Sequence, residues 1–313
     1  MIPTWDNREQ LKTCLEALEK QTCGSFRVLV CVDGSTDGTL EWLEKTRFSF
    51  EHVILTHSNR LHKGRCATRN LSLPVLNAKF TAFLDSDMIP GNNWLQMHKI
   101  VLESNNCISL GYVKYADSKN DMISMYLQSR GIGKFKDGRR IPAFHLNTQN
   151  TAMKTRYYIQ AGGQDEQLDA SYGGDDIELG YRLGMSFGVQ AIVNKQAVCL
   201  CFGRKSIDRL LDCMQDFGAG NLVRIRRKHP DFHSLFRFKW IAASAGISSG
   251  LPATPGNLSY ILPLLSRLPA RIRNALIHAL VFISVSRGYA SRIGRVTPKG
   301  KAARIFGKGI HHG

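Results

Sequence analysis

Short apolar runs alternate with amphipathic segments along the first two thirds of the chain. Leu11, Leu15 and Leu18 recur at helical spacing, which predicts a helix over residues 8–21. The other predicted elements are helices at 39–46 and 92–104 and strands at 1–4, 26–32, 52–57, 79–84 and 107–113. This alternation is typical of a doubly wound α/β sheet, whose ligands bind beyond the carboxyl ends of the strands. The loops after residues 32 and 84 are therefore the first places to search for a site.

The pattern changes near residue 203. The segments 207–217 and 221–230 have helical periodicity, and the second is strongly basic. The best apolar run, 275–286, has about half of the ~20 residues that span a bilayer, so an interfacial or a packed helix is expected there. We predict an α/β domain over 1–203 and a basic, mostly helical extension over 204–313.

Charge is distributed unevenly between these two parts. The whole chain has a net charge of +17. Residues 204–313 hold 19 Lys and Arg against four Asp, a net of +15, so the first 203 residues carry only +2. Such a basic extension favours an anionic partner, either nucleic acid or a membrane of acidic lipids. The last stretch, 292–313, is basic and contains glycine, and we expect it to be loose.

The cysteines indicate a reducing compartment. The chain has eight, with no C-x-x-C pair, and Cys31 lies inside the apolar run FRVLVCV, where a free thiol behaves as a small hydrophobe. Polar residues and Pro3 follow Met1 closely, so no secretory signal is expected. The predicted location is cytoplasmic.

Two carboxylates stand at the end of the predicted strand 79–84. In FLDSDM, Asp85 and Asp87 are two residues apart, so in an extended segment their side chains point the same way. Ionised carboxylates at the end of a buried strand need a positive partner. A divalent cation, Mg²⁺ or Mn²⁺, would supply the charge and could bridge to a substrate phosphate. A pair of solvated loop aspartates is the structural alternative.

Two further segments allow a binding or a purely structural interpretation. VDGSTDGT places Asp33 after a strand, either as part of a turn before a capped helix or as an acceptor for a ligand such as a nucleotide base. KGRCATRN places Arg65 and Arg69 on one helix face, for a phosphate or ribose contact or as a solvated basic face.

A second acidic cluster lies within GGQDEQLDASYGGDDIELGYRL, residues 162–183. Asp175 and Glu178 have capping-box spacing, which predicts Asp175 as the N-cap of a helix. That pattern leaves Asp176 unexplained. It would lie in the first turn, where the helix dipole favours its ionised form and Asp175 opposes it. Beside a glycine-rich loop that lets a substrate approach, Asp176 is a candidate general base.

In this order and at this spacing, the motifs resemble those of family 2 glycosyltransferases with the GT-A fold. The matching pieces are IPTWDNR, VDGSTDGT, GRCATRN, FLDSDMIP as the D-x-D element, and GGQDE followed by GGDDIELGYRL. They cover about residues 1–200. The last block is most similar to the acceptor-side segment of chondroitin-polymerase-type and galactosyltransferase-type enzymes. The resemblance implies a nucleotide-binding, Rossmann-like mixed sheet flanked by helices.

The resemblance also implies roles for individual residues. The implied donor-binding residues are Thr4, Asp33, Arg69 and Asp85. Asp87, with Asp85 near it, would hold the metal that bridges the donor diphosphate. Asp176 stands where the family places its catalytic base, which implies direct attack by an acceptor hydroxyl and inversion. The implied acceptor-side residues are Asp165, Glu166 and Asp175.

The implied activity is a hexosyltransferase-type transfer from a nucleoside-diphosphate sugar, with uridine as the expected base, to a glycan or lipid-linked acceptor. Synthesis of a cell-envelope or extracellular polysaccharide, with peripheral attachment to the cytoplasmic face of an anionic membrane, would fit. The chain departs from the family pattern at Asp175, where glutamate is usual, and in AVCLCFGRKS, which lacks the histidine that many relatives use as a metal ligand. It also lacks a Q-x-x-R-W element, so a processive synthase is not expected.

Three alternatives remain open at this point. RIRRKHP and the basic tail would suit a non-catalytic nucleic-acid-binding protein, although the acidic clusters would then have no role. A metal-dependent phosphotransferase or nucleotidyltransferase could use the same two aspartates and would release pyrophosphate. A degenerate glycosyltransferase could bind a donor without turnover.

Overall fold

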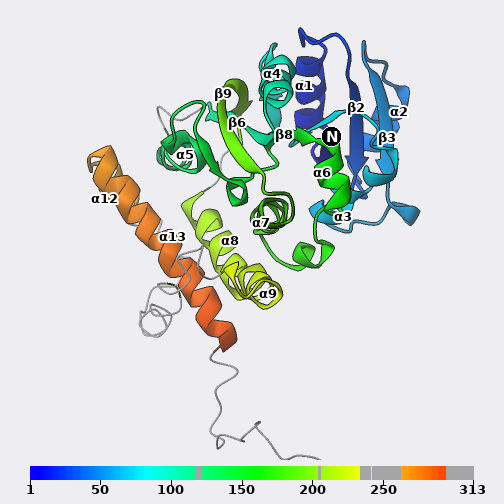
Figure 1. Ribbon diagram of the computed structural model, residues 1–313. Coiled ribbons are helices and arrows are strands. Elements are labelled where there is room, and N and C mark those ends of the chain that lie inside the picture. Colours follow the sequence, from blue (N-terminus) through cyan, green and yellow to red (C-terminus); the bar gives the residue numbers. More distant parts are fainter. Residues whose placement is uncertain (117–120, 204–205, 233–240, 242–261, 294–313) are drawn as a thin grey trace, which may run out of the picture.

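A computed structural model describes residues 1–116, 121–203, 206–232, 241 and 262–293 (Figure 1). The strands are β1 (Ile2–Thr4), β2 (Arg27–Val32), β3 (Glu51–Thr56), β4 (Phe80–Leu84), β5 (Met88–Pro90), β6 (Cys107–Tyr115), β7 (Arg140–Pro142), β8 (Asn150–Lys154) and β9 (Gln190–Cys201). The helices of the α/β part are α1 (Arg8–Leu18), α2 (Thr39–Lys45), α3 (Arg65–Asn70), α4 (Trp94–Ser104), α5 (Met122–Gln128), α6 (Thr155–Gln160) and α7 (Asp175–Phe187). The C-terminal helices are α8 (Ile207–Ala219), α9 (Asn221–Lys228), α12 (Leu262–Ser266) and α13 (Ala270–Ile293).

The first three strands form a parallel sheet in the order β1-β2-β3, with Ile2 opposite Val30. The backbone N–H of Leu84 donates to the carbonyl of Met1 at 3.1 Å, which joins β4 to this sheet through β1. Strand β1 lies between β2 and β4, and Asp33 and Asp85 directly follow those two strands, so the two aspartates lie at the same edge of the sheet.

The second sheet is mixed, with the order β4-β8-β6-β9-β5 and with β7 paired to β9. Strands β4 and β8 are antiparallel, whereas β6 and β9 are parallel. The mixed sheet flanked by helices that the resemblance implied is therefore confirmed. The apolar pattern had not predicted β5, β7, β8 or β9.

Helices cover both faces of the sheet, because successive side chains of a strand point to opposite sides. Val30 packs with α1, α2 and α4 on one face, and the neighbouring Cys31 packs with α6 and α7 on the other. Large buried side chains such as Leu15 of α1 and Tyr158 of α6 close these two layers. The result is a three-layer α/β/α arrangement (Figure 1).

The C-terminal helices pack against the α/β part through a shared apolar cluster that joins Tyr181 of α7 to Phe217 of α8 and Tyr289 of α13. Helices α8 and α13 lie side by side (Figure 1). A Cβ atom on Gly288 would come within 1.9 Å of the carbonyl oxygen of Gln215, so the two backbones approach as closely as glycine allows. The helix predicted near 275–286 is thus a packed helix, and it is longer than its apolar run. The division at residue 203 remains a prediction.

In the described part of the chain, no helix is both long and apolar enough to cross a membrane. The predicted loose tail, residues 292–313, lies outside the described residues from 294 onward.

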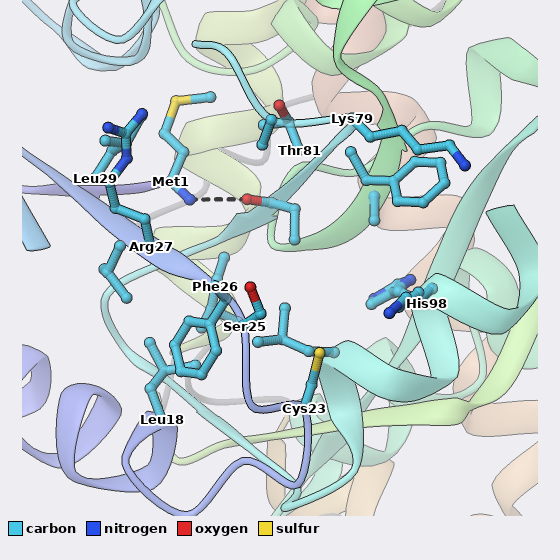
Figure 2. Close-up of a pocket in the computed structure, with 18 of the residues that line it drawn as sticks. Met1, Leu18, Cys23, Ser25, Phe26, Arg27, Leu29, Lys79, Thr81 and His98 are labelled. Carbon is cyan, nitrogen blue, oxygen red and sulfur yellow. Dashed lines mark hydrogen bonds between the residues drawn. The ribbon is translucent and has the colours of Figure 1, made fainter. Parts of the chain in front are cut away.

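A cavity of about 370 Å³ lies between the first residues of β2 and β4 (Figure 2). Arg27 and Leu29 line one side and Thr81 the other, and the Met1 amine donates to the carbonyl of Ala82 at 2.8 Å across its end. Arg27 and Thr81 lie at the amino ends of β2 and β4. None of Asp33, Asp85 and Asp176 lines this cavity, and we assign it no part in the active site.

Candidate active site

Arg69 of α3 is the positive partner that the end of β4 required. Its guanidinium is 4% exposed, and it donates to Oδ1 of Asp85 at 2.7 Å. A second nitrogen of Arg69 lies 3.8 Å from Oδ2 of Asp175 on α7. One buried guanidinium therefore joins the end of β4 to the start of α7. A charge-assisted pair this deeply buried is held firmly because separating it would leave an uncompensated charge.

Asp175 faces the arginines and does not cap its helix. Arg65 approaches it with two nitrogens, Nε at 3.0 Å and Nη2 at 2.9 Å. The N-cap of α7 is Gly174, in the left-handed region at φ 87°, and Asp175 is the first helical residue. The predicted N-cap role of Asp175 is wrong, because a glycine turns the chain and leaves the carboxylate free to pair. The predicted shared face of Arg65 and Arg69 is confirmed, and it is not a solvated face.

Asp176 lies beside this paired carboxylate. The hydroxyl of Thr148 donates to its Oδ1 at 2.6 Å. Burial, and next the negative charge of Asp175, raise the pKa of Asp176 to about 7, while Arg69 and the Thr148 hydrogen bond oppose the rise. A carboxylate with a pKa near neutrality can accept a proton and release it again under physiological conditions.

Glu178, two residues further along α7, has the opposite surroundings. Its side chain is fully buried, with Arg182 Nε and His229 Nε2 each 2.9 Å and Lys228 Nζ 2.8 Å from Oε1. Burial alone would raise the pKa of Glu178, but the Lys228 and Arg182 contacts hold it below its ordinary value. The predicted capping-box role of Glu178 is therefore wrong: the residue attaches α9 to α7.

Asp33 binds the loop between β3 and α3. Its two oxygens accept the backbone N–H groups of Lys63, at 2.7 Å, and Gly64, at 3.0 Å. Nδ1 of His62 lies 2.9 Å from Oδ2 of Asp33. Thr4 is next to Asp33, because its carbonyl accepts the Asp33 N–H at 2.9 Å. The structure therefore brings Thr4 and Asp33 together at the carboxyl ends of β1 and β2, where the aspartate orders the loop between β3 and α3.

Asp87 is exposed at the same edge. It lies near Gly203, where a Cβ atom would be 3.5 Å from Oδ2 of Asp87. Within the described ranges, no group of three or more His, Cys, Asp or Glu side chains could hold a metal ion. Cys199 and Cys201 are buried in β9, and burial raises the pKa of Cys199 well above its ordinary value, so it is not poised to become a thiolate ligand.

The model for "Glycosyl transferase family 2" matches residues 1–161, just over half of the chain. The chain belongs to glycosyl transferase family 2. Among curated proteins it is similar to chondroitin synthase of Pasteurella multocida, at 27% identity over 217 residues. It is also similar to an Escherichia coli protein named UDP-Glc:alpha-D-GlcNAc-diphosphoundecaprenol beta-1,3-glucosyltransferase, at 30% identity over 141 residues. These alignments cover 58% and 45% of this chain but only 22% and 51% of the two relatives.

Solved structures show the same fold. A mannosyltransferase from Pyrobaculum calidifontis, in complex with GDP-Man and Mn²⁺, has a TM-score of 0.59 at 17% identity, over 91% of this chain and 84% of that one. TarS residues 1–349 from S. aureus, in complex with UDP-GlcNAc, has a TM-score of 0.54 at 14% identity, over 94% of this chain and 90% of that one. The expected GT-A fold is confirmed.

Two predicted acceptor-side residues of this family 2 chain lie on the short helical turn Glu166–Ala170 and its cap. Asp165 caps the turn and lies 2.6 Å from Lys228 Nζ, and Glu166 accepts a hydrogen bond from Asn70 at 2.9 Å. Both residues therefore border the junction of α3, α7 and α9.

Sequence reasoning missed Asp169, which supports the basic face of α3. Its carboxylate accepts the backbone N–H groups of Cys66 and Ala67, both at 2.9 Å, and so satisfies the first turn of the helix that carries Arg65 and Arg69. No local pattern could reveal this cap, because donor and acceptor are about a hundred residues apart.

Proposed function

We propose that this chain is an inverting glycosyltransferase that moves a sugar from a nucleoside-diphosphate donor to a hydroxyl of a glycan or lipid-linked acceptor. The observation that carries the proposal is the junction between β4 and α7. There Arg69 joins the donor-side Asp85 to Asp175, the neighbour of a carboxylate with a pKa of about 7. One buried side chain thereby links the proposed donor-binding end of the sheet to the helix that carries the candidate base.

The donor would lie over the ends of β1, β2 and β4. The proposed donor-binding residues are Thr4, Asp33, Arg69 and Asp85. Nε of Arg69 and Nε2 of Gln164 are buried and have no hydrogen-bond acceptor among the described residues, which is unusual for native proteins. Both nitrogens belong to side chains at this edge. Oxygen atoms of a bound sugar nucleotide could accept their hydrogen bonds. Neighbouring structures of the same fold contain GDP-Man and UDP-GlcNAc, and we propose a uridine nucleotide for this chain.

Asp85 and Asp87 would hold a divalent cation. Carboxylate oxygens suit Mn²⁺ and Mg²⁺, and Mg²⁺ sites commonly use one or two carboxylates and complete their shell with phosphate oxygens and water. Asp85 and Asp87 would supply two such carboxylates, and the mannosyltransferase of the same fold contains Mn²⁺. The bound ion would offset negative charge on the leaving diphosphate.

Asp176 would act as the base. Its free oxygen takes the proton of the acceptor hydroxyl, the acceptor oxygen bonds to the anomeric carbon, and the bond from that carbon to the diphosphate oxygen breaks. Attack from the side opposite the leaving group inverts the configuration. Thr148 orients the carboxylate through its 2.6 Å hydrogen bond, and Asp175 keeps the proton affinity of Asp176 high.

Asp165, Glu166 and Asp175 are proposed to line the acceptor side. The names of the two curated relatives concern a glycan and a sugar on a diphosphoundecaprenol lipid, which supports a role in polysaccharide synthesis. None of the eight cysteines forms a disulfide, and we propose a cytoplasmic location. The nucleic-acid alternative leaves the paired aspartates around Arg69 without a role, so we do not favour it.

Calorimetric titration of UDP, with and without Mn²⁺, tests the donor site. We expect binding that requires Mn²⁺ and weakens at least about tenfold in Asp87→Ala. Asp212→Ala, which changes an exposed aspartate on α8, is the matched control and should bind as the wild type does. Equal affinity with and without Mn²⁺, or in Asp87→Ala, would contradict the proposed metal site. Release of pyrophosphate from a UDP-sugar would favour a nucleotidyltransferase.

A further inference from the structure

One side of α13 is packed against α8, but α12 and α13 also have apolar side chains that are exposed. Ile277 and Val285 are buried against α8 and its neighbours, at 0% and 7% exposure. By contrast, Leu264, Ile272 and Leu276 are 63%, 51% and 42% exposed. Figure 1 shows these two helices at the outside of the molecule, with α8 alongside α13. The two helices therefore carry apolar side chains that packing within the described chain does not bury.

The exposed apolar residues along α13 form one stripe. Ile272, Leu276, Ala279 and Ile283 follow one another at intervals of three or four, so they share a face of this helix. Each is exposed or half-buried. We call these four residues the outer stripe. A surface helix normally places polar residues on such a face, and a continuous apolar face marks an interaction site.

The charges that flank the outer stripe are all positive. Residues 262–293 contain five arginines and no aspartate or glutamate. Arg267 and Arg271 are exposed at the amino end of α13, and Arg292 is exposed at its last turn. An amphipathic helix with an apolar face and flanking arginines matches the chemistry of an anionic lipid surface, which takes apolar side chains below its phosphates and attracts cations at them.

We propose that α12 and α13 bind an anionic membrane surface, with the outer stripe inserted at the level of the lipid headgroups. Among the described residues no helix could span the bilayer, so the contact is an interfacial one. A second copy on the same face would bring arginines against arginines. A nucleic acid would pair with the arginines but would leave Ile272 and Leu276 in water.

The proposal does not depend on the proposed glycosyltransferase activity. It does give a reason for the basic extension, since a helix pair bound to the membrane would hold the active site close to a lipid-linked acceptor. The donor site and this surface share no residue, so each can fail in experiment while the other stands.

Co-sedimentation with vesicles tests the proposal. The probes are vesicles of phosphatidylcholine alone and of phosphatidylcholine mixed with phosphatidylglycerol. We expect the wild type to bind only the mixed vesicles, and the double variant Ile272→Glu with Leu276→Glu to lose binding at least tenfold. Met185→Glu is the matched control, because Met185 is an apolar residue of α7 that is 67% exposed on another element. It should bind as the wild type does.

Arg267→Glu with Arg271→Glu should also weaken binding to the mixed vesicles, and more so at low than at high salt. Thermal unfolding and circular dichroism confirm that each variant is folded. No vesicle binding by the wild type, or unchanged binding by the double apolar variant, would overturn the proposal. A change in oligomeric mass of that variant with unchanged vesicle binding would show that a second copy covers the stripe.

Discussion

Two regions of the molecule meet along α7, and each supplies a different environment to a carboxylate of the same helix. On the side of α3 and β4, Asp176 lies beside the negative Asp175, and its pKa rises to about 7. On the side of α9, Glu178 lies among Arg182, Lys228 and His229, and its pKa is held below its ordinary value. Glu178 is fully buried and Asp176 is half-buried, yet only Asp176 holds its proton near neutral pH.

The difference shows that the effect of burial on the pKa of a carboxylate depends on the charges around it. Burial raises the proton affinity of any carboxylate, and neighbouring charges then add to this effect or cancel it. Around Asp176 the nearest carboxylate adds to it, which leaves a group ready to accept a proton. Around Glu178 three nitrogen partners cancel it, which leaves a permanent anion that joins two helices. We therefore assign chemistry to Asp176 and attachment to Glu178.

The largest effect is expected from Asp176→Asn. The amide cannot take up the acceptor proton, so turnover should fall about 100- to 10,000-fold, the range in which general bases contribute. Release of UDP from the sugar nucleotide that the wild type uses is the measurement. UDP affinity should stay within a few-fold of the wild type. An Asp176→Asn protein that retains full turnover would remove Asp176 from the mechanism.

The same carboxylate predicts a pH dependence. The folded-state pKa of Asp176 is raised from 3.8 to about 7, so between those values the folded protein holds a proton that the unfolded chain has lost. Stability should therefore decline as the pH rises through this window, and the decline should be smaller in Asp176→Asn. Turnover should instead rise with pH and level off above about 7. Melting temperatures and rates across that range test both signs.

Glu178→Gln should act on stability instead. Removing the negative charge of this buried ionic cluster leaves its cations uncompensated. The free energy of unfolding should fall by about 3 kcal/mol or more. Denaturant unfolding measures this loss, and protein that remains folded should still bind UDP. If the variant were as stable as the wild type but inactive, the assignments of the two carboxylates would have to be exchanged.

Lys228→Ala should have the smallest effect. Its side chain is 42% exposed although its ammonium contacts both Asp165 and Glu178, so solvent screens much of the interaction. We expect the free energy of unfolding, measured with denaturant, to fall by less than about 1 kcal/mol, and by less still at high salt. A loss as large as that of Glu178→Gln would mean that Lys228 alone compensates the buried charge.

Patterns along the chain were enough to predict the local elements and the location of the site. Helices α1, α2 and α4 and strands β2, β3, β4 and β6 are found within a few residues of their predicted ranges, since periodicity depends on neighbours in the chain. The positions of Asp33 and Asp85 after β2 and β4 followed from the same pattern. Recognition of family 2 came from the order of motifs, which is also readable along the chain.

Which charges meet could be learned only from how distant segments pack. Asp175 has capping spacing, yet its partner is Arg65, 110 residues away, and the left-handed Gly174 takes the capping position. Glu178 pairs with His229, 51 residues further on. Strand β8 was not predicted because it is ordered by antiparallel pairing with β4, far away in sequence. Spacing along a chain reports which residues share a face, whereas the partner of a buried carboxylate depends on how distant elements pack.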